Sequence, residues 1–153
     1  MCWSSNKNPI PQIAEKDIEV LKICRQFDFQ KSNDCASSYY ASYLYRIDVE
    51  TTRIPLKVNK RRQRHTTTFG YIINEGYHSY DPDKVKLNID KFGDVKVICY
   101  DEVEGEYCDL GYFSRFPNLV KLLCIIPKGT TYYENVRGEI VSECIKPIKI
   151  EKI

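Results

Sequence analysis

The sequence has few of the residues that most often carry metal or acid–base chemistry. Of its 153 residues only two are histidines, and none of its seven cysteines belongs to a CxxC pair. Structural zinc sites usually need such closely spaced ligands, and an odd number of scattered cysteines does not make a disulfide framework. We therefore expect no metal site. The cysteines that lie in apolar runs are interpreted as buried small hydrophobic residues: Cys24, Cys99, Cys124 and Cys144.

Long hydrophobic runs are also missing. No stretch approaches the roughly 20 apolar residues of a transmembrane helix, and residues 1–12 contain no basic segment followed by an apolar core. These absences predict a cytoplasmic protein without membrane contact. With 42% hydrophobic and 29% charged residues, the chain fits one globular domain, residues 1–153. Within it, residues 1–16 are expected to form an N-terminal arm that Cys2 and Trp3 anchor against the body.

The net charge of +2 is too small to indicate a nucleic-acid-binding protein by itself. The basic residues are nevertheless concentrated in "KVNKRRQRH", residues 57–65. A solvated loop is the simplest interpretation. The alternative is an anion-binding patch that faces phosphate groups, and its residues are Lys60, Arg61, Arg62 and Arg64. No pattern of a known RNA-binding module or zinc finger accompanies the patch, so nucleic-acid binding through residues 57–65 is the weaker hypothesis.

Hydrophobic residues alternate with a period of two along most of the chain, which is typical of β-strands. We expect strands within residues 17–25, 37–58, 66–80, 95–113 and 119–153. The run 37–58 is limited by Pro55 to a sheet edge or strand end, and 66–80 is broken at Gly76. Residues 95–113 predict two strands around a turn at Glu104 and Gly105. Residues 119–153 predict two or three strands with turns at 127–129 and 137–138.

One segment, residues 81–93, predicts a helix. Asp81 can cap its first turn and Pro82 suits the first helical position. Val85, Ile89 and Phe92 then fall on one helical face, and Gly93 can end the helix. Together these features predict an α+β fold, with a mostly antiparallel sheet and one or two helices.

The chain contains twelve tyrosines, more than a core of this size needs, because each buried hydroxyl requires a partner. Surfaces rich in aromatic and hydroxyl groups are suited to ligand binding, and an arginine can bind phosphate through two hydrogen bonds. We predict that the ligand-binding residues are Arg25, Tyr39, Tyr40, Tyr77, His78, Ser79, Tyr80, Tyr132 and Tyr133.

His78 lies in "EGYHSY" and Glu139 begins the last part of "IIPKGTTYYENVRGEIVS". An imidazole can hydrogen-bond a ribose hydroxyl, and a carboxylate can support an oxocarbenium-like transition state. If the protein is an enzyme, we expect His78 and Glu139 to be catalytic and to lie within about 12 Å of each other, since they must reach one ribose. In the alternative interpretation His78 caps a strand end and Glu139 faces solvent.

These two stretches resemble the His-Tyr-Glu branch of the mono-ADP-ribosyltransferases. In that family one strand carries a "YHG[TS]"-like element, and a late strand carries the catalytic Glu after an "hxxPxGT" segment. Here Tyr77, His78 and Ser79 resemble the first element, and "IIPKGT" with "GEIVS" resembles the second. The resemblance implies an ADP-ribosyltransferase-like fold and NAD as the cofactor.

The order of motifs along nearly the whole chain is similar to that of small uncharacterised proteins from gut anaerobic bacteria and their bacteriophages. Those proteins begin with "MC", continue through a proline-containing arm and a "GFHSY" turn, and end near "KCIIPKGxxYYEG". This chain has "MC", "PIPQIAEKDIEVLKICR", "SSYYASYLY", "EGYHSY" and "LLCIIPKGTTYYEN" in the same order. The resemblance implies a phage or mobile-element accessory protein in the cytosol, and it brings no established activity.

Two functions therefore stand as hypotheses. The first is an accessory protein that binds a nucleotide-derived small molecule or a host defence component, without catalysis and without a cofactor. Its partner would be that molecule or a host protein, and an oligomer is compatible with this hypothesis. The second is an ADP-ribosyltransferase-like enzyme that uses NAD, with His78 and Glu139 as its catalytic residues.

Overall fold

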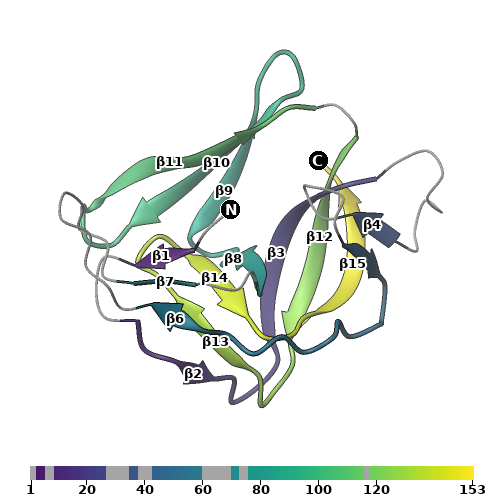
Figure 1. Ribbon diagram of the computed structural model, residues 1–153. Coiled ribbons are helices and arrows are strands. Elements are labelled where there is room, and N and C mark those ends of the chain that lie inside the picture. Colours follow the sequence, from purple (N-terminus) through teal and green to yellow (C-terminus); the bar gives the residue numbers. More distant parts are fainter. Residues whose placement is uncertain are drawn as a thin grey trace.

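The computed structural model describes residues 3–5, 9–26, 35–37, 43–59, 70–72, 76–115 and 118–153. These residues form strands, turns and irregular segments, and none of them is helical. The fold is therefore all-β with antiparallel pairing, and the predicted α+β class is wrong (Figure 1). The described residues contain no helix with the length and apolar character needed to span a membrane.

The largest sheet has nine strands, all paired antiparallel. Its main path runs in the order β15 (Lys146–Lys152), β12 (Leu119–Ile126), β3 (Ile18–Arg25), β8 (Tyr77–Tyr80), β14 (Glu139–Ser142), β13 (Thr131–Glu134) and β2 (Gln12–Ile13). Two further strands extend the sheet from β3: β4 (Cys35–Ser37) and β5 (Leu44–Arg46). Segments far apart in the sequence thus meet at β8, which lies between β3 and β14.

Two smaller sheets complete the structure, each with three antiparallel strands. One consists of β11 (Glu106–Phe113), β10 (Val95–Asp101) and β9 (Val85–Ile89). The other consists of β1 (Ser4–Ser5), β7 (Gly70–Ile72) and β6 (Val58–Asn59). In Figure 1 the sheet of β9 to β11 lies across the upper part of the molecule, above the large sheet.

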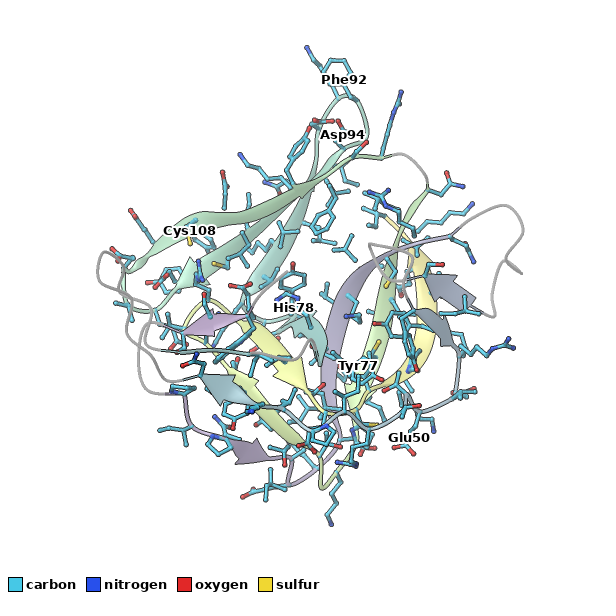
Figure 2. The ribbon with its side chains drawn as sticks, viewed as in Figure 1. Glu50, Tyr77, His78, Phe92, Asp94 and Cys108 are labelled. Atoms are coloured by element: carbon cyan, nitrogen blue, oxygen red, sulfur yellow. The ribbon has the colours of Figure 1, made fainter. Side chains whose placement is uncertain are left out.

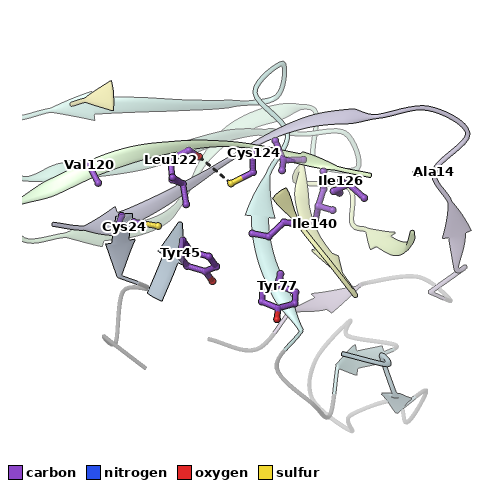
Figure 3. Packing of buried hydrophobic residues seen from close by; sticks show 12 residues of the cluster. Ala14, Cys24, Tyr45, Tyr77, Val120, Leu122, Cys124, Ile126 and Ile140 are labelled. Atoms are coloured by element: carbon purple, nitrogen blue, oxygen red, sulfur yellow. Dashed lines mark hydrogen bonds between the residues drawn. The ribbon is translucent and has the colours of Figure 1, made fainter. Parts of the chain in front are cut away.

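Both faces of the large sheet are covered, as the side chains of β3 show. Val20 and Cys24 belong to a core cluster with Tyr77 and Leu122, and we call this side of the sheet the inner face (Figure 3). Leu21 and others pack on the opposite side, the outer face, against residues of β9 to β11. Because apolar cover exists on both sides, every residue of β3 from Val20 to Arg25 is buried, whichever face it points to.

The predicted helix at residues 81–93 is wrong. Asp81 does accept hydrogen bonds from the backbone N–H groups of Lys84 and Val85, but the turn ends there. The chain continues as β9, which pairs with β10. In "VKLNI" apolar and polar residues alternate as in a strand, and Val85 and Ile89 also fall on one face of a helix. The sequence pattern therefore fits both elements. Pairing with the apolar strand β10 favours the strand conformation. In this conformation Ile89 and Phe92 are more than half exposed.

The strand expectations are confirmed in large part. Residues 17–25 contain β3, and 95–113 form the hairpin of β10 and β11, whose turn includes Gly105. Residues 119–153 contain four strands instead of two or three.

The expected long strand at 37–58 is interrupted. Residues 47–57 follow an irregular path whose backbone hydrogen-bonds to the carbonyls of Glu143, Ile145 and Pro147. The segment is thus held against residues 143–147, where β14 leads into β15.

The N-terminal arm is integrated into the fold. β1 pairs with β7 and β2 pairs with β13. The side chain of Trp3 is 2% exposed, and its Nε1–H donates a hydrogen bond of 2.9 Å to the carbonyl oxygen of Glu139. Trp3 therefore anchors the arm as expected, while Cys2 lies outside the described residues.

Gly76 offers a test of how tightly the segment before β8 is packed. It has φ of 52°, and a Cβ there would lie 2.5 Å from Leu56 Cδ2 and 2.8 Å from Val141 Cγ2. Gly105, at φ 68°, has nothing within 4 Å of such a Cβ. Gly105→Ala should cost only backbone strain, about 1–2 kcal/mol of unfolding free energy, and Gly76→Ala about 1–3 kcal/mol more through overpacking. Urea denaturation measures both, and equal losses would contradict the packing at Gly76.

Candidate functional site

His78 and Glu139 lie side by side on neighbouring strands. β8 and β14 pair so that Tyr80 is opposite Glu139 and His78 is opposite Val141. The His78 Nε2 and Glu139 Oε2 atoms are 3.3 Å apart, well within the distance at which both could reach one ribose. The structure thus brings this pair together, on the side of β8 where Figure 2 labels His78.

The Glu139 carboxylate is held by three side chains. His78 contacts Oε2, while the Asn135 amide donates a hydrogen bond of 3.2 Å to Oε1 and Arg137 Nη2 lies 3.3 Å from Oε1. Asn135 is itself fixed, since it accepts from the backbone N–H groups of Arg137 and Glu139 and donates to the carbonyl of Ser4. The Glu139 side chain is 9% exposed, so its charge is neutralised inside the protein instead of by solvent.

The charge states of the pair follow from this environment. Burial by itself raises the pKa of Glu139, but the hydrogen bond and charge of His78, together with Arg137, lower the pKa below its ordinary value. Burial lowers the pKa of His78, and the opposing effect of Glu139 does not fully offset it. At neutral pH the carboxylate is ionised and the imidazole is neutral. Because a carboxylate only accepts, we assign the imidazole hydrogen to Nε2.

This arrangement is better suited to orienting groups than to proton transfer. Three of the about four lone-pair sites of the carboxylate are already engaged by His78, Asn135 and Arg137, so little capacity is left for a substrate hydroxyl. The His78 ring also packs edge-on against Tyr80, with 5.1 Å between centroids. The cluster fixes β8 against β14 and the arm.

The predicted ligand-binding residues are divided between the two faces of the sheet. Successive side chains on a strand point to opposite sides, so Tyr77 and Ser79 lie on the inner face and His78 and Tyr80 on the outer face. The same alternation separates the tyrosines of β13. Tyr132 packs against the inner cluster, whereas Tyr133 lies with Trp3, at a ring-centroid distance of 5.9 Å. The residues thus form two groups instead of the single site that we expected.

On the inner face, the residue at the centre of the group is Ser142, which the sequence analysis missed. The register places Ser142 between Tyr77 of β8 and Tyr132 of β13. Ser142 and Ser79 are both fully buried, and their hydroxyl oxygens have no hydrogen-bond partner among the described residues. Thr130 Oγ1 shares this property.

Lys22 adds a positive group to the inner face and was also missed. It lies on β3 between Val20 and Cys24, and only 8% of the residue is exposed. Its Nζ donates a hydrogen bond to the carbonyl oxygen of His78 and lies 5.4 Å from the centroid of the Tyr45 ring. Burial lowers the pKa of Lys22. We refer to Lys22, Tyr77, Ser79, Tyr132 and Ser142 as the inner polar group.

Arg25, the remaining candidate that the structure describes, joins neither group. Arg25 is on the outer face, but it lies four residues along β3 from Leu21, the partner of Tyr80, which is about 13 Å along an extended strand. Its Nη1 donates to the carbonyl of Ser114 at 3.2 Å. The other candidates lie outside the described residues: Tyr39, Tyr40, Lys60, Arg61, Arg62 and Arg64.

No family model, curated protein or solved structure matches the chain. Within the part of the chain that the structure describes, no group of three or more His, Cys, Asp or Glu side chains is arranged to hold a metal ion. The interpretation of the site therefore depends on the geometry of its own residues.

The coupling between His78 and Glu139 can be measured directly. Glu139→Gln preserves shape but removes the negative charge that raises the pKa of His78, so this pKa should fall further. Because the folded-state pKa lies below the ordinary 6.5, the stabilising contribution of His78 is complete above 6.5 and is lost as pH falls through the folded-state pKa. NMR titration of the imidazole reports the change, and a His65→Gln background leaves a single histidine signal. Glu151→Gln, which alters a pair with Lys121 on another strand, is the control and should leave His78 unchanged.

Lys22 predicts a second dependence on pH. Its folded-state pKa lies below the ordinary 10.5, so the unfolded chain binds the proton more strongly and stability rises with pH toward 10.5. Lys22→Met removes this effect but keeps the buried tyrosines. The unfolding free energy of Lys22→Met minus that of the wild type should therefore decrease between pH 7 and 9.5. A constant difference would contradict the burial of the ammonium.

Proposed function

We propose that the protein binds a small nucleotide-derived molecule without converting it, as a cytosolic accessory protein of the phage type that the sequence resembles. The observation that carries this proposal is the inner polar group. It combines a buried amine, two fully buried hydroxyls without partners among the described residues, and two tyrosines.

Buried hydroxyls without partners are rare, and each one costs about 1–3 kcal/mol. A ligand that brings oxygen acceptors to Ser79 and Ser142 removes this cost. Phosphate and ribose oxygens are such acceptors, and phosphate charge also favours the ammonium form of Lys22. Nucleotide-derived molecules carry both kinds of oxygen.

The two tyrosines are held in fixed positions beside these groups. The Tyr77 hydroxyl donates to the carbonyl of Thr52 at 2.6 Å, and the Tyr132 hydroxyl donates to Gln12 Oε1 at 2.8 Å. Their rings flank Ser142 in the register of the sheet. Tyr77 is packed in the core, whereas the partly buried Tyr132 offers a ring face to a nucleobase, a contact worth about 1–3 kcal/mol in nucleic-acid systems.

The NAD-dependent alternative depends on the 3.3 Å distance between His78 and Glu139. The engagement of both Glu139 oxygens by His78, Asn135 and Arg137 favours a positioning role over catalysis. A measurement of nicotinamide release from NAD separates the two functions, because only the enzyme produces it.

The test is a thermal-shift and calorimetric comparison with cyclic dinucleotides, ADP-ribose and NAD. We expect at least one of these to raise the melting temperature of the wild type, with no release of nicotinamide from NAD. Binding should weaken as pH rises, since an anionic ligand requires the protonated amine of Lys22.

Ser142→Ala and Ser79→Ala provide matched variants. Removal of a hydroxyl that lacks a partner should leave stability equal or higher by up to about 1–3 kcal/mol, while the response to the ligand should fall at least tenfold. Ser114→Ala, at an exposed position, should change neither quantity. A silent panel, or full binding by Ser142→Ala, would overturn the proposal. Release of nicotinamide would favour the enzyme.

A further inference from the structure

Cys99 and Cys108 face each other on adjacent strands of the three-stranded sheet. They are direct partners in the antiparallel register of β10 and β11, and their sulfur atoms are 3.3 Å apart. Both are free thiols, and both contribute to the cluster that fills the space between this sheet and the large one. Figure 2 labels Cys108 on this sheet, away from the inner polar group.

The backbone already has the geometry of a disulfide. Direct partners in an antiparallel pair have Cα atoms about 4.5 or 5.5 Å apart, and disulfides span Cα distances of about 4.4–6.8 Å. A sulfur–sulfur bond is about 2.05 Å long, so the two atoms need to approach by about 1.2 Å from their distance of 3.3 Å. Side-chain rotation supplies such a movement without a change of register.

From this geometry we propose that Cys99 and Cys108 form an oxidation site, a cross-strand dithiol that a peroxide converts to a disulfide. The site is separate from the inner polar group, so its existence does not depend on the proposed function.

The two thiols have different roles in the reaction. Cys108 is partly exposed and Cys99 is fully buried, so the peroxide reaches Cys108. The Cys108 sulfur takes one oxygen from hydrogen peroxide to give a sulfenic acid, and one water is released. The Cys99 sulfur then attacks the Cys108 sulfur; the S–S bond forms, the S–O bond breaks, and the Cys99 proton leaves with the oxygen as a second water. Two thiols and one peroxide thus become one disulfide and two waters.

Burial raises the pKa of Cys99, as does its hydrogen bond with Cys108. Cys99 therefore stays protonated until its partner is oxidised, which suits a resolving thiol better than an initial nucleophile. The disulfide would tie β11, an edge strand of its sheet, covalently to β10. We expect the hairpin to open less often in the oxidised protein, and reductant to reverse this effect.

The decisive experiment is mass spectrometry of the folded full-length protein after treatment with hydrogen peroxide, alkylation of the remaining thiols and proteolysis. We expect a peptide pair linked through Cys99 and Cys108, a higher melting temperature, and the loss of both changes after treatment with dithiothreitol. When the chain is oxidised in urea, the linkage of Cys99 to Cys108 should not be preferred over other cysteine pairings, because the strand register is then lost.

Two substitutions and one internal control test the roles of the two thiols. Cys99→Ala should stop the reaction at a sulfenic acid on Cys108 that dimedone traps, and Cys108→Ser should leave Cys99 reduced. Cys24 and Cys124 lie on the paired strands β3 and β12 but four positions out of register. They should stay free thiols and be recovered as alkylated peptides.

Phenylarsine oxide, which bridges two neighbouring thiols, provides a measurement on the wild type without oxidation. It should protect Cys99 and Cys108 together from alkylation. The proposal is overturned if both thiols stay separate at peroxide concentrations that oxidise Cys108, if Cys108 joins another cysteine instead, or if the arsenical protects neither.

Discussion

The fold depends on one constraint: the central strands β3, β8 and β14 are covered on both faces. Apolar side chains alone meet this constraint easily, and Leu21 and Val20 do so on opposite sides of the same strand. A polar side chain in the buried part of such a strand cannot turn to solvent. It must find a partner within one of the two cores. The properties of the candidate site follow from how each polar residue of β3, β8 and β14 meets this requirement.

The two faces meet the requirement in different ways. On the outer face, the charge of Glu139 is balanced by Arg137 and shared with His78 and Asn135, so the cluster is nearly complete without any other molecule. On the inner face, the carbonyl oxygen of His78 and the ring of Tyr45 lie close to the Lys22 amine, and neither carries a full negative charge. The outer cluster therefore stabilises the protein as it stands, whereas the inner one leaves binding capacity unused. This difference is why the binding proposal rests on the inner face.

The sequence predicted the strands well where a single period fitted the segment. The hairpin of β10 and β11 and the strand β3 were found because alternation and turn residues agree there. Residues 81–93 were assigned to a helix because "VKLNI" fits both periods and Asp81 can begin either a helix or a turn. The pairing of β9 with β10 decides between helix and strand. It is a tertiary interaction, which the local sequence pattern does not reveal. The α+β class was wrong for that reason.

The candidate site was predicted in part for a similar reason. The enzyme hypothesis predicted that His78 and Glu139 lie close together, and the structure places them on adjacent strands. Tyr77 and His78 lie on opposite faces of the sheet. Their prediction as one group of ligand-binding residues ignored the alternation that puts consecutive residues of a strand on opposite faces.

The sequence did hold a signal for Lys22. A lysine two residues from Val20 and two from Cys24, within a strand whose other face is also apolar, has no route to solvent once both faces are covered. What the sequence could not supply is the register that sets Ser142 between Tyr77 and Tyr132. The pairing of β8 with β14 joins strands more than fifty residues apart, and the inner polar group exists only because of it. A sequence of this kind can therefore show that a buried charge requires an explanation, while only the pairing of distant strands can show which groups gather around it.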